Sequence, residues 1–336
     1  MKQHRFIGFW GFFSLALVLT LTWQVAAAAD KPITLSWVSF TSPMSATAKT
    51  IQKGFFDRVN EMGKGELVIK FRGGPEAIAA FDQGKAVQRG IVDISVVPIG
   101  FYEALVPGVG GMMLSRVSLE EERRPGGGYD YLVEMHKKGG LYYLGRGVPT
   151  KENFFYLTLN KRVEKPEDFK GLKVGTATAG FAAAQAWGAS VVSLRMPEYY
   201  SAMERGLVDG VATSALSSWV AQGVYEVTKY FVDHPYYQST VGVIMNLDRW
   251  NKLPADLQKL LTEAMVQSEK YQLEEAEKEY AKMRKKIEAS GVEFYKFAPE
   301  VAKWFLETAY DAAWAYQMKR FPEVTPKLKA LLTKEE

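Results

Sequence analysis

The chain has 336 residues, of which 47% are hydrophobic and 24% are charged. This composition is typical of a globular protein with one large domain or two smaller ones, and it excludes a disordered or fibrous chain. The chain has no cysteine, which excludes disulfides, thiolate metal sites, cysteine nucleophiles and a lipid-modified N-terminal cysteine. Its net charge of +4 lacks the basic surplus of a nucleic-acid-binding protein.

The first 29 residues have the pattern of a secretory signal peptide. Lys2 and Arg5 precede an apolar run from Phe6 to Leu21, and a run of alanines comes just before Asp30. An uncleaved transmembrane anchor is the alternative, because residues 6–29 are just long enough to span a bilayer. No later stretch is long and apolar enough for a second span. We expect residues 1–29 to be removed and the remaining chain, with a net charge of +2, to work in the periplasm.

Strand-like and helix-like patterns then alternate along the chain. Alternating apolar residues predict strands over 33–40, 66–71 and 92–97, and helical spacing predicts helices over 46–62 and 77–89. A second set begins near residue 141, with strands predicted over 141–144, 154–159, 173–174, 191–194 and 210–213. Helices are predicted between them over 181–187, 197–204 and 216–225. This alternation predicts two α/β lobes, and a further strand over 238–247 could carry the chain between them.

Residues 254–290 contain no glycine and no internal proline, and they are rich in leucine, alanine, glutamate and lysine. They predict a helix of roughly 55 Å at 1.5 Å per residue, long enough to run across both lobes. A strand over 292–297 and an aromatic-rich helix over 298–320 follow, and we expect that helix to pack back on one lobe. The expected organisation is a first lobe over 30–150 with contributions from the C-terminal part of the chain, a second lobe over 151–247, and over 248–336 the long spanning helix and C-terminal helices that pack back on the lobes.

Motifs for catalysis are missing from the sequence. It contains no GxSxG nucleophile turn, no phosphate-binding loop and no HExxH zinc motif. His136 and His234 are isolated and have no neighbour at metal-ligand spacing. We therefore predict no enzyme activity, no metal and no cofactor. By elimination the chain is a binding protein that holds a small molecule between its lobes, beyond the carboxyl ends of the strands. An exported enzyme or a sensor component on the same fold is the alternative.

The second lobe carries a set of ordered motifs: Lys165-Pro-Glu-Asp-Phe-Lys-Gly-Leu-Lys-Val174, Trp187-Gly-Ala-Ser190, Pro197-Glu-Tyr-Tyr-Ser-Ala-Met-Glu-Arg-Gly-Leu-Val-Asp-Gly210, Tyr225-Glu-Val-Thr-Lys-Tyr230 and Asn246-Leu-Asp-Arg-Trp-Asn-Lys-Leu-Pro254. With these motifs the chain resembles the solute-binding proteins of tripartite ATP-independent periplasmic (TRAP) transporters, the DctP-type family. The resemblance spans residue 31 to the C-terminus and is strongest over 165–265. It implies a two-lobed, periplasmic-binding-protein-like fold with a central ligand cleft that closes, a long helix across both lobes, and delivery to the TRAP permease subunits in the membrane.

The chain departs from this family at positions that bear on the ligand. Most relatives have an arginine directly after the Gly-Leu-Lys-Val segment, where it grips a carboxylate, and this chain has Gly175 there. A second basic position corresponds to Phe155. Positions that are polar or charged in acidic-sugar-binding relatives fall on Pro98, Phe101 and Thr213. The resemblance therefore does not carry over the usual dicarboxylate or sugar-acid specificity.

Two hypotheses for the ligand follow. In the first, an apolar, aromatic cleft takes a hydrophobic or aromatic molecule, with hydroxyl contacts from threonine and serine side chains that include Thr178. In the second, a carboxylate is bound by an arginine relocated to Arg146, Arg195 or Arg72. The predicted ligand-binding residues are Phe40, Glu76, Phe101, Tyr102, Arg146, Phe155, Gly175, Thr176, Arg195, Met196, Thr213, Ser214, Trp219 and Tyr236.

Overall fold

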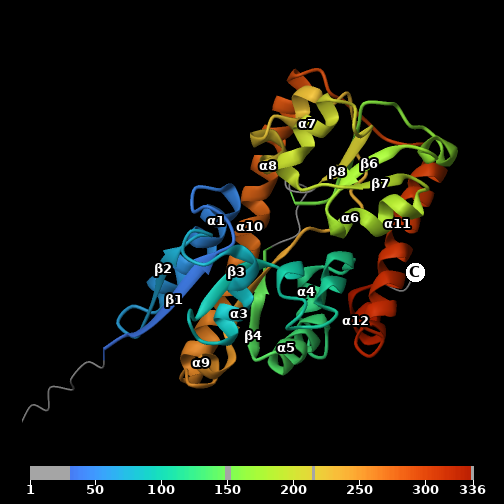
Figure 1. The fold of residues 1–336 in the computed structure, drawn as a ribbon. Coiled ribbons are helices and arrows are strands. Elements are labelled where there is room, and N and C mark those ends of the chain that lie inside the picture. The colour runs from blue at the N-terminus through green and yellow to red at the C-terminus, as the bar shows by residue number, and fades with distance from the viewer. Residues whose placement is uncertain (1–30, 148–152, 214–215, 334–336) are drawn as a thin grey trace, which may run out of the picture. The chain divides into compact units, whose positions relative to one another are not determined.

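The computed structural model describes residues 31–147, 153–213 and 216–333. The predicted signal peptide, residues 1–29, lies outside the described residues. The described chain folds into two mixed β-sheets with helices around them, which confirms the predicted α/β class (Figure 1). In the part of the chain that the structure describes, no helix has both the length and the apolar character that crossing a membrane requires.

The first sheet has five strands. In spatial order they are β2 (Leu67–Gly73), β1 (Ile33–Ser39), β3 (Ile94–Pro98), β10 (Val241–Asn246) and β4 (Leu141–Arg146). β1 runs parallel to β2 and β3, and β10 runs antiparallel to β3 and β4. By strand pairing β10 belongs to this sheet, whereas the predicted second lobe, 151–247, included it. The reason is packing, because Val243 and Ile244 enter the hydrophobic cores on opposite faces of the sheet.

Helices and helical turns cover both faces of the first sheet, and together they form the first lobe. They are α1 (Ala46–Ile51), the π-helical turn η1 (Gln52–Asp57), α2 (Arg58–Met62), η2 (Ala80–Asp82), α3 (Gln83–Gln88), η3 (Ile99–Phe101), η4 (Val109–Leu114), α4 (Leu119–Glu122), α5 (Gly128–Lys138) and α9 (Leu247–Asn251). The helix predicted over 77–89 is shorter than expected, since regular helix begins only at Gln83. The buried Gln83 side chain explains this start, because its Nε2 donates to the Ser39 and Ile78 carbonyls and so holds the preceding turn.

The second sheet has six strands and forms the second lobe with the elements around it. The spatial order is β11 (Glu293–Tyr295), β9 (Tyr230–Val232), β5 (Tyr156–Leu159), β8 (Gly210–Thr213), β6 (Lys173–Thr176) and β7 (Ser190–Ser193). β6 is parallel to β7 and β8, whereas β5 is antiparallel to β8 and β9. The helical elements are η5 (Pro166–Phe169), α6 (Thr178–Ala186), η6 (Met196–Glu198), α7 (Tyr199–Glu204), α8 (Leu216–Ala221) and η7 (Val224–Val227).

Helix α10 (Ala255–Ala289) is the long helix that the sequence predicts, and its 35 residues are continuous. Leu257, Leu261 and Met265 enter the core of the first lobe. Tyr280 and Ile287, several turns later, enter a core of the second lobe. Figure 1 shows the helix, in orange, passing α1 and then α8. The prediction that this helix spans both lobes is confirmed.

The C-terminal helices also connect the lobes. Helix α11 (Pro299–Arg320) packs against α6 through Phe305 and Ala309 and then reaches η4 of the first lobe. Helix α12 (Thr325–Leu332) packs on α5 and η4, where Leu328 and Leu332 enter the core of the first lobe. The aromatic helix predicted over 298–320 therefore contacts both lobes.

Several motif residues serve the scaffold. The Asp209 carboxylate accepts a hydrogen bond from the Lys173 backbone N–H at 2.9 Å, and its own N–H donates to the Lys173 carbonyl at 2.8 Å. The Asp168 carboxylate accepts from the backbone N–H of Glu164 and Lys165. Trp187 donates its indole N–H to the Phe305 carbonyl at 2.9 Å and fastens α6 to α11. These contacts hold the strands and helices of the second lobe together.

Candidate functional site

The carboxyl ends of the parallel strands define one edge of each sheet. At this edge of the first sheet β1, β3 and β4 end and β10 begins. At the corresponding edge of the second sheet β6, β7, β8 and β9 end and β5 begins. Ligands of open α/β sheets bind beyond such edges. The two carboxyl edges are therefore the place where the sequence-based reasoning puts the ligand.

The chain crosses between the carboxyl edges after β4 and again before β10, and the described parts of these two segments are hydrogen-bonded to each other. Gly147 donates its N–H to the Val241 carbonyl at 2.9 Å, and the Thr240 hydroxyl donates to the Gly147 carbonyl at 2.8 Å. Nearer the second sheet, Phe155 donates its N–H to the Tyr237 carbonyl at 2.9 Å. These hydrogen bonds join the described parts of the two segments, which connect the lobes together with α10 and α11.

Two cavities lie beside this connection, between elements of both lobes and α11. One has a volume of about 340 Å³, and its walls include Gly100 of η3, Thr178 and Ala179 of α6, and Gln317 of α11. The other has a volume of about 360 Å³, and its walls include Tyr236. The two cavities share Met113, Leu114 and Tyr237. Each cavity is large enough for a small organic molecule.

The predicted ligand-binding residues of the first lobe lie at its carboxyl edge, on its surface and in its core. Phe40 and Phe101 are partly buried just beyond the ends of β1 and β3, at the carboxyl edge. Glu76 is exposed, and its carboxylate accepts a hydrogen bond from the Gly74 N–H at 2.6 Å. That backbone hydrogen bond lowers the pKa of Glu76. Tyr102 instead lies in the core, where its hydroxyl meets His136 Nε2 at 3.1 Å.

The buried His136 gives a prediction for stability against pH. Its Nδ1–H donates to the Leu132 carbonyl at 2.6 Å, so Nε2 is left to accept from Tyr102 and the ring is neutral. Burial lowers the pKa of His136 to about 4, so the unfolded chain binds the proton more readily than the folded one. Neutral His136 therefore contributes about 3 kcal/mol to the free energy of unfolding relative to acidic pH. This contribution is complete above pH 6.5 and is lost as the pH falls toward 4. Urea unfolding across this range should show the loss, and His136→Gln should show a flatter pH dependence, while an equal slope in both would contradict the assignment.

Arg146 is the last residue of β4 and is only 1% exposed. Its Nη2 contacts the Glu122 carboxylate at 2.5 Å, and Nη1 lies 3.4 Å from the Met112 carbonyl and 3.3 Å from Gln238 Oε1. Gln238 in turn donates its side-chain amide to the Ser115 carbonyl at 2.6 Å. Arg146 therefore has its charge matched within the protein and ties the connection between the lobes to the first lobe.

Phe155 and Tyr236 lie together at the carboxyl edge of the second sheet. Their ring centroids are 6.0 Å apart, and Tyr237 packs against both. The Tyr236 hydroxyl is buried and has no hydrogen-bond partner among the described residues. Burial raises its pKa well above the usual value, so it is a protonated donor at neutral pH.

Gly175 and Thr176 end β6 and are both buried. The Thr176 hydroxyl donates to the Ala212 carbonyl, 3.1 Å away. A Cβ placed at Gly175 would lie 2.6 Å from Leu194 Cδ1 and 3.3 Å from side-chain carbons of Val208 and Val211. The space beside Gly175 is therefore filled by apolar side chains of the second lobe.

The remaining predicted residues are scattered over the second lobe. Arg195 follows β7, its side chain is 87% exposed, and it lies 3.6 Å from Glu198. Met196 packs at the margin of a core, and Trp219 is fully buried in it with an indole N–H that lacks a partner among the described residues. Thr213 ends β8, and Ser214 lies outside the described residues. Arg72, the last candidate arginine, belongs to the first lobe instead, where it is exposed near the end of β2.

Sequence reasoning missed most of the residues that line the two cavities. Met113, Leu114 and Tyr237 were not predicted, and neither was Gln317 of α11. Of the predicted ligand-binding residues, Tyr236 lines one cavity, and Thr178, a hydroxyl contact in the first ligand hypothesis, lines the other. The missed residues lie in η4, in the connection before β10 and in α11, where nothing in the sequence distinguishes a cavity wall from a core. Within residues 31–147, 153–213 and 216–333, no group of three or more acidic or histidine side chains is arranged to hold a metal ion.

Comparison with known proteins agrees with this architecture. Residues 38–320 match the model of the bacterial extracellular solute-binding proteins, family 7, called DctP. The chain belongs to this family. The C4-dicarboxylate-binding periplasmic protein DctP of Rhodobacter capsulatus is 25% identical over 301 residues, which are 86% of this chain and 88% of that protein. As in the rest of the family, the chain is a solute receptor, and the prediction that it is not an enzyme is confirmed.

Solved structures of family members share the fold. A TRAP periplasmic solute-binding protein from Ochrobactrum anthropi, with its C-terminus bound in the ligand-binding pocket, superposes with a TM-score of 0.77 at 23% identity and covers 90% of this chain and 95% of its own. One from Desulfovibrio salexigens with bound orotic acid gives 0.74 at 21% identity and covers 89% and 97%. The predicted two-lobed TRAP solute-binding fold is thereby confirmed, and the family's periplasmic location agrees with the expected compartment.

Proposed function

We propose that this family 7 protein binds a mainly apolar or aromatic organic molecule between the carboxyl edges of its two sheets. The proposal rests on the apolar and aromatic side chains that surround the two positions where the resemblance implies carboxylate-binding arginines. Phe155 packs there on Tyr236 and Tyr237, and the space beside Gly175 is filled by Leu194. An aromatic wall favours a ligand with a flat or apolar body.

Few polar contacts are available to such a ligand at the second sheet. The Tyr236 hydroxyl is a buried donor without a partner in the described chain, and Tyr236 lines one of the two cavities. A buried donor that stays unpaired costs about 1–3 kcal/mol, so a ligand oxygen that reached the Tyr236 hydroxyl would recover this energy. We therefore propose that the ligand carries an acceptor oxygen on a larger apolar body.

The cellular role follows from the family. We propose that residues 1–29 direct export, that the lobes close around the ligand, and that the closed form delivers it to the membrane subunits of a TRAP transporter. Family membership and the two-sheet, two-lobed fold support this proposal.

A relocated arginine is the second candidate, and Arg195 is the residue that fits it. Arg195 lies just beyond the carboxyl end of β7, and its exposed guanidinium makes only a 3.6 Å contact with Glu198. A surface pair of this kind is weak, so the side chain is free to reach a carboxylate. Arg146 does not fit the role, because binding a ligand would leave Glu122 buried without its partner.

Thermal unfolding with three probes separates these candidates. We expect benzoate and the neutral benzamide to raise the Tm and succinate to leave it unchanged, since a ligand at 100 times its Kd stabilises by about 2.7 kcal/mol. If Arg195 binds a carboxylate, benzoate but not benzamide will raise the Tm, and Arg195→Ala will abolish the shift. Arg205→Ala, another arginine of the second lobe, is the control. Stabilisation by succinate alone would contradict the proposal.

A further inference from the structure

We propose that Phe81, stacked on Phe101, is the surface of the first lobe that recognises a planar ring of the ligand. This inference rests on the proposed function, because it adds a specificity-determining residue to the same site. The sequence-based set of ligand residues did not include Phe81, and nothing in the local sequence distinguishes it from a core phenylalanine.

The exposure of Phe81 is the first observation. Its side chain is 69% exposed, which makes it one of the most exposed large apolar residues in the described chain, together with Met44 and Ile91. One ring face is covered, since Phe101 lies with its centroid 3.9 Å away and its plane inclined by 26°. The other face is left open. Single exposed apolar residues are common on protein surfaces, so the position of this ring has to decide its meaning.

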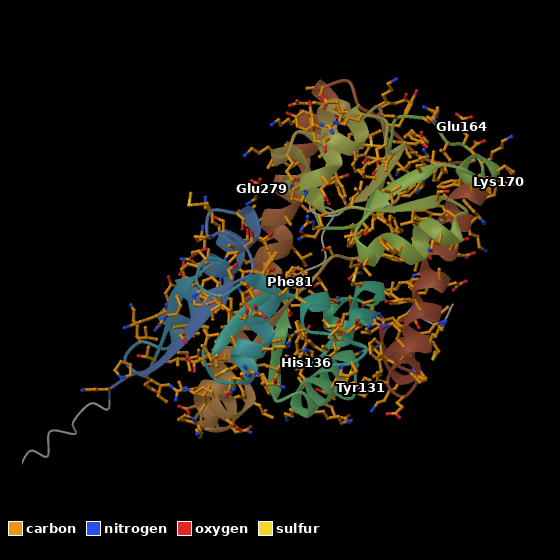
Figure 2. All side chains as sticks on the ribbon, viewed as in Figure 1. Phe81, Tyr131, His136, Glu164, Lys170 and Glu279 are labelled. Atoms are coloured by element: carbon orange, nitrogen blue, oxygen red, sulfur yellow. The ribbon has the colours of Figure 1, made fainter. Side chains whose placement is uncertain are left out.

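The fold holds Phe81 at the carboxyl edge of the first sheet. Two residues after it, the buried Gln83 donates to the Ser39 carbonyl at the end of β1, at 2.7 Å, and accepts from the Ser95 hydroxyl of β3 at 2.8 Å. Phe101 closes the helical turn η3, which begins directly after β3. Both rings are thus fastened over the strand ends that face the connection to the second lobe. Figure 2 shows Phe81 on the side of the first lobe nearest to the second.

A cavity for a ring lies next to this pair. The cavity of about 340 Å³ is lined by Gly100, the residue before Phe101, and by Thr178 and Ala179 of α6, whereas the Phe81 and Phe101 side chains are not among its lining residues. A Cβ added at Gly100 would meet no atom within 4 Å, so the space beside Gly100 is open, and a planar ligand that extended from the cavity past Gly100 would approach the Phe101 and Phe81 rings. Aromatic rings prefer offset stacking, and a planar ligand would continue the existing stack, whereas a saturated ring of similar size would not.

Binding of benzoate and of cyclohexanecarboxylate tests this stacking, since the two acids share charge and approximate size and differ in planarity. We expect the unmodified protein to prefer benzoate by about threefold to tenfold, the usual range for one aromatic pair. Phe81→Leu should reduce the preference at least twofold, with any remainder due to the Phe155 and Tyr236 rings, and Phe81→Tyr should keep it. Ile91→Ala is the matched control, because Ile91 is also 69% exposed but precedes β3, at the opposite edge of the first sheet.

Thiol labelling gives a second measurement that does not depend on folding energetics. The natural chain has no cysteine, so Phe81→Cys and Ile91→Cys each introduce a single thiol at an exposed position. Benzoate should slow labelling at position 81 at least threefold and leave position 91 unchanged. If both acids bind, two results would overturn the inference and leave the proposed function standing. One is a preference for benzoate that is unchanged in Phe81→Leu. The other is an equal effect of benzoate on the labelling rates of the two thiols. If neither ring acid binds, the inference fails, and binding of succinate then shows that the proposed function has failed with it.

Discussion

Replacing Arg146 with methionine is expected to destabilise the chain by about 3–5 kcal/mol, because the change leaves a buried carboxylate without its partner. Glu122 is 2% exposed, and its contact with Arg146 at 2.5 Å joins α4 to the end of β4. Arg146 also contacts Gln238 at 3.3 Å, so the substitution also removes a contact to the segment that connects the lobes before β10. Urea unfolding followed by tryptophan fluorescence measures the effect.

Two further variants make this prediction specific. Arg195→Ala should change the unfolding free energy by less than about 1 kcal/mol, because this arginine is exposed and its ion pair is weak. The double variant Arg146→Met, Glu122→Leu should recover most of the stability, since it removes both charges. If Arg146→Met alone unfolds at the same urea concentration as the natural chain, the buried Arg146–Glu122 pair does not stabilise the fold.

Trp187→Ala is the second change with a large expected effect, a loss of about 3–5 kcal/mol. Trp187 is buried and stacks on Phe305 with ring centroids 4.1 Å apart and planes inclined by 13°. Its ring also lies edge-on to Tyr236, 4.9 Å away, so the cavity would loosen a wall of the candidate site. Thermal unfolding should show a lower Tm.

Trp304 provides the matched control for this change. It has the same side chain and packs against Phe169 in the same core, but it is only partly buried. Trp304→Ala should therefore cost clearly less than Trp187→Ala. Equal losses in the two variants would contradict the view that Trp187 joins α6 to α11.

Most of the fold could be predicted from the sequence, because the signals were local and strong. The uninterrupted pattern of α10 depends on residues within one helix, and its bounds of Ala255–Ala289 lie within one residue of the predicted 254–290. Asp209 and Trp187 lie in the motifs that carry the family resemblance, and their hydrogen bonds hold the second lobe together. The sheet that receives β10 could not be predicted, because a buried apolar strand fits either sheet by pattern alone.

The candidate site was predicted less completely, for a physical reason. A pattern shows that a residue type suits a site, but the partners of that residue lie far away in the sequence. Arg146 was a candidate carboxylate ligand, and its partner Glu122 became visible only when α4 was placed against β4. Tyr102 was a candidate contact, and its partner His136 comes from α5. Phe81 is the opposite case, a candidate site residue that the sequence did not indicate. Its exposed position follows from Gln83, which holds the turn against β1.

Isothermal titration of the unmodified chain with benzoate at several temperatures tests the central claim most directly. We expect saturable binding with a negative heat-capacity change, the mark of apolar surface buried on association. Succinate under the same conditions should give no saturable heat. Saturable binding of succinate together with no heat from benzoate would show that the chain binds small dicarboxylates, and the aromatic cleft inferred from Phe155 and Tyr236 would then be wrong.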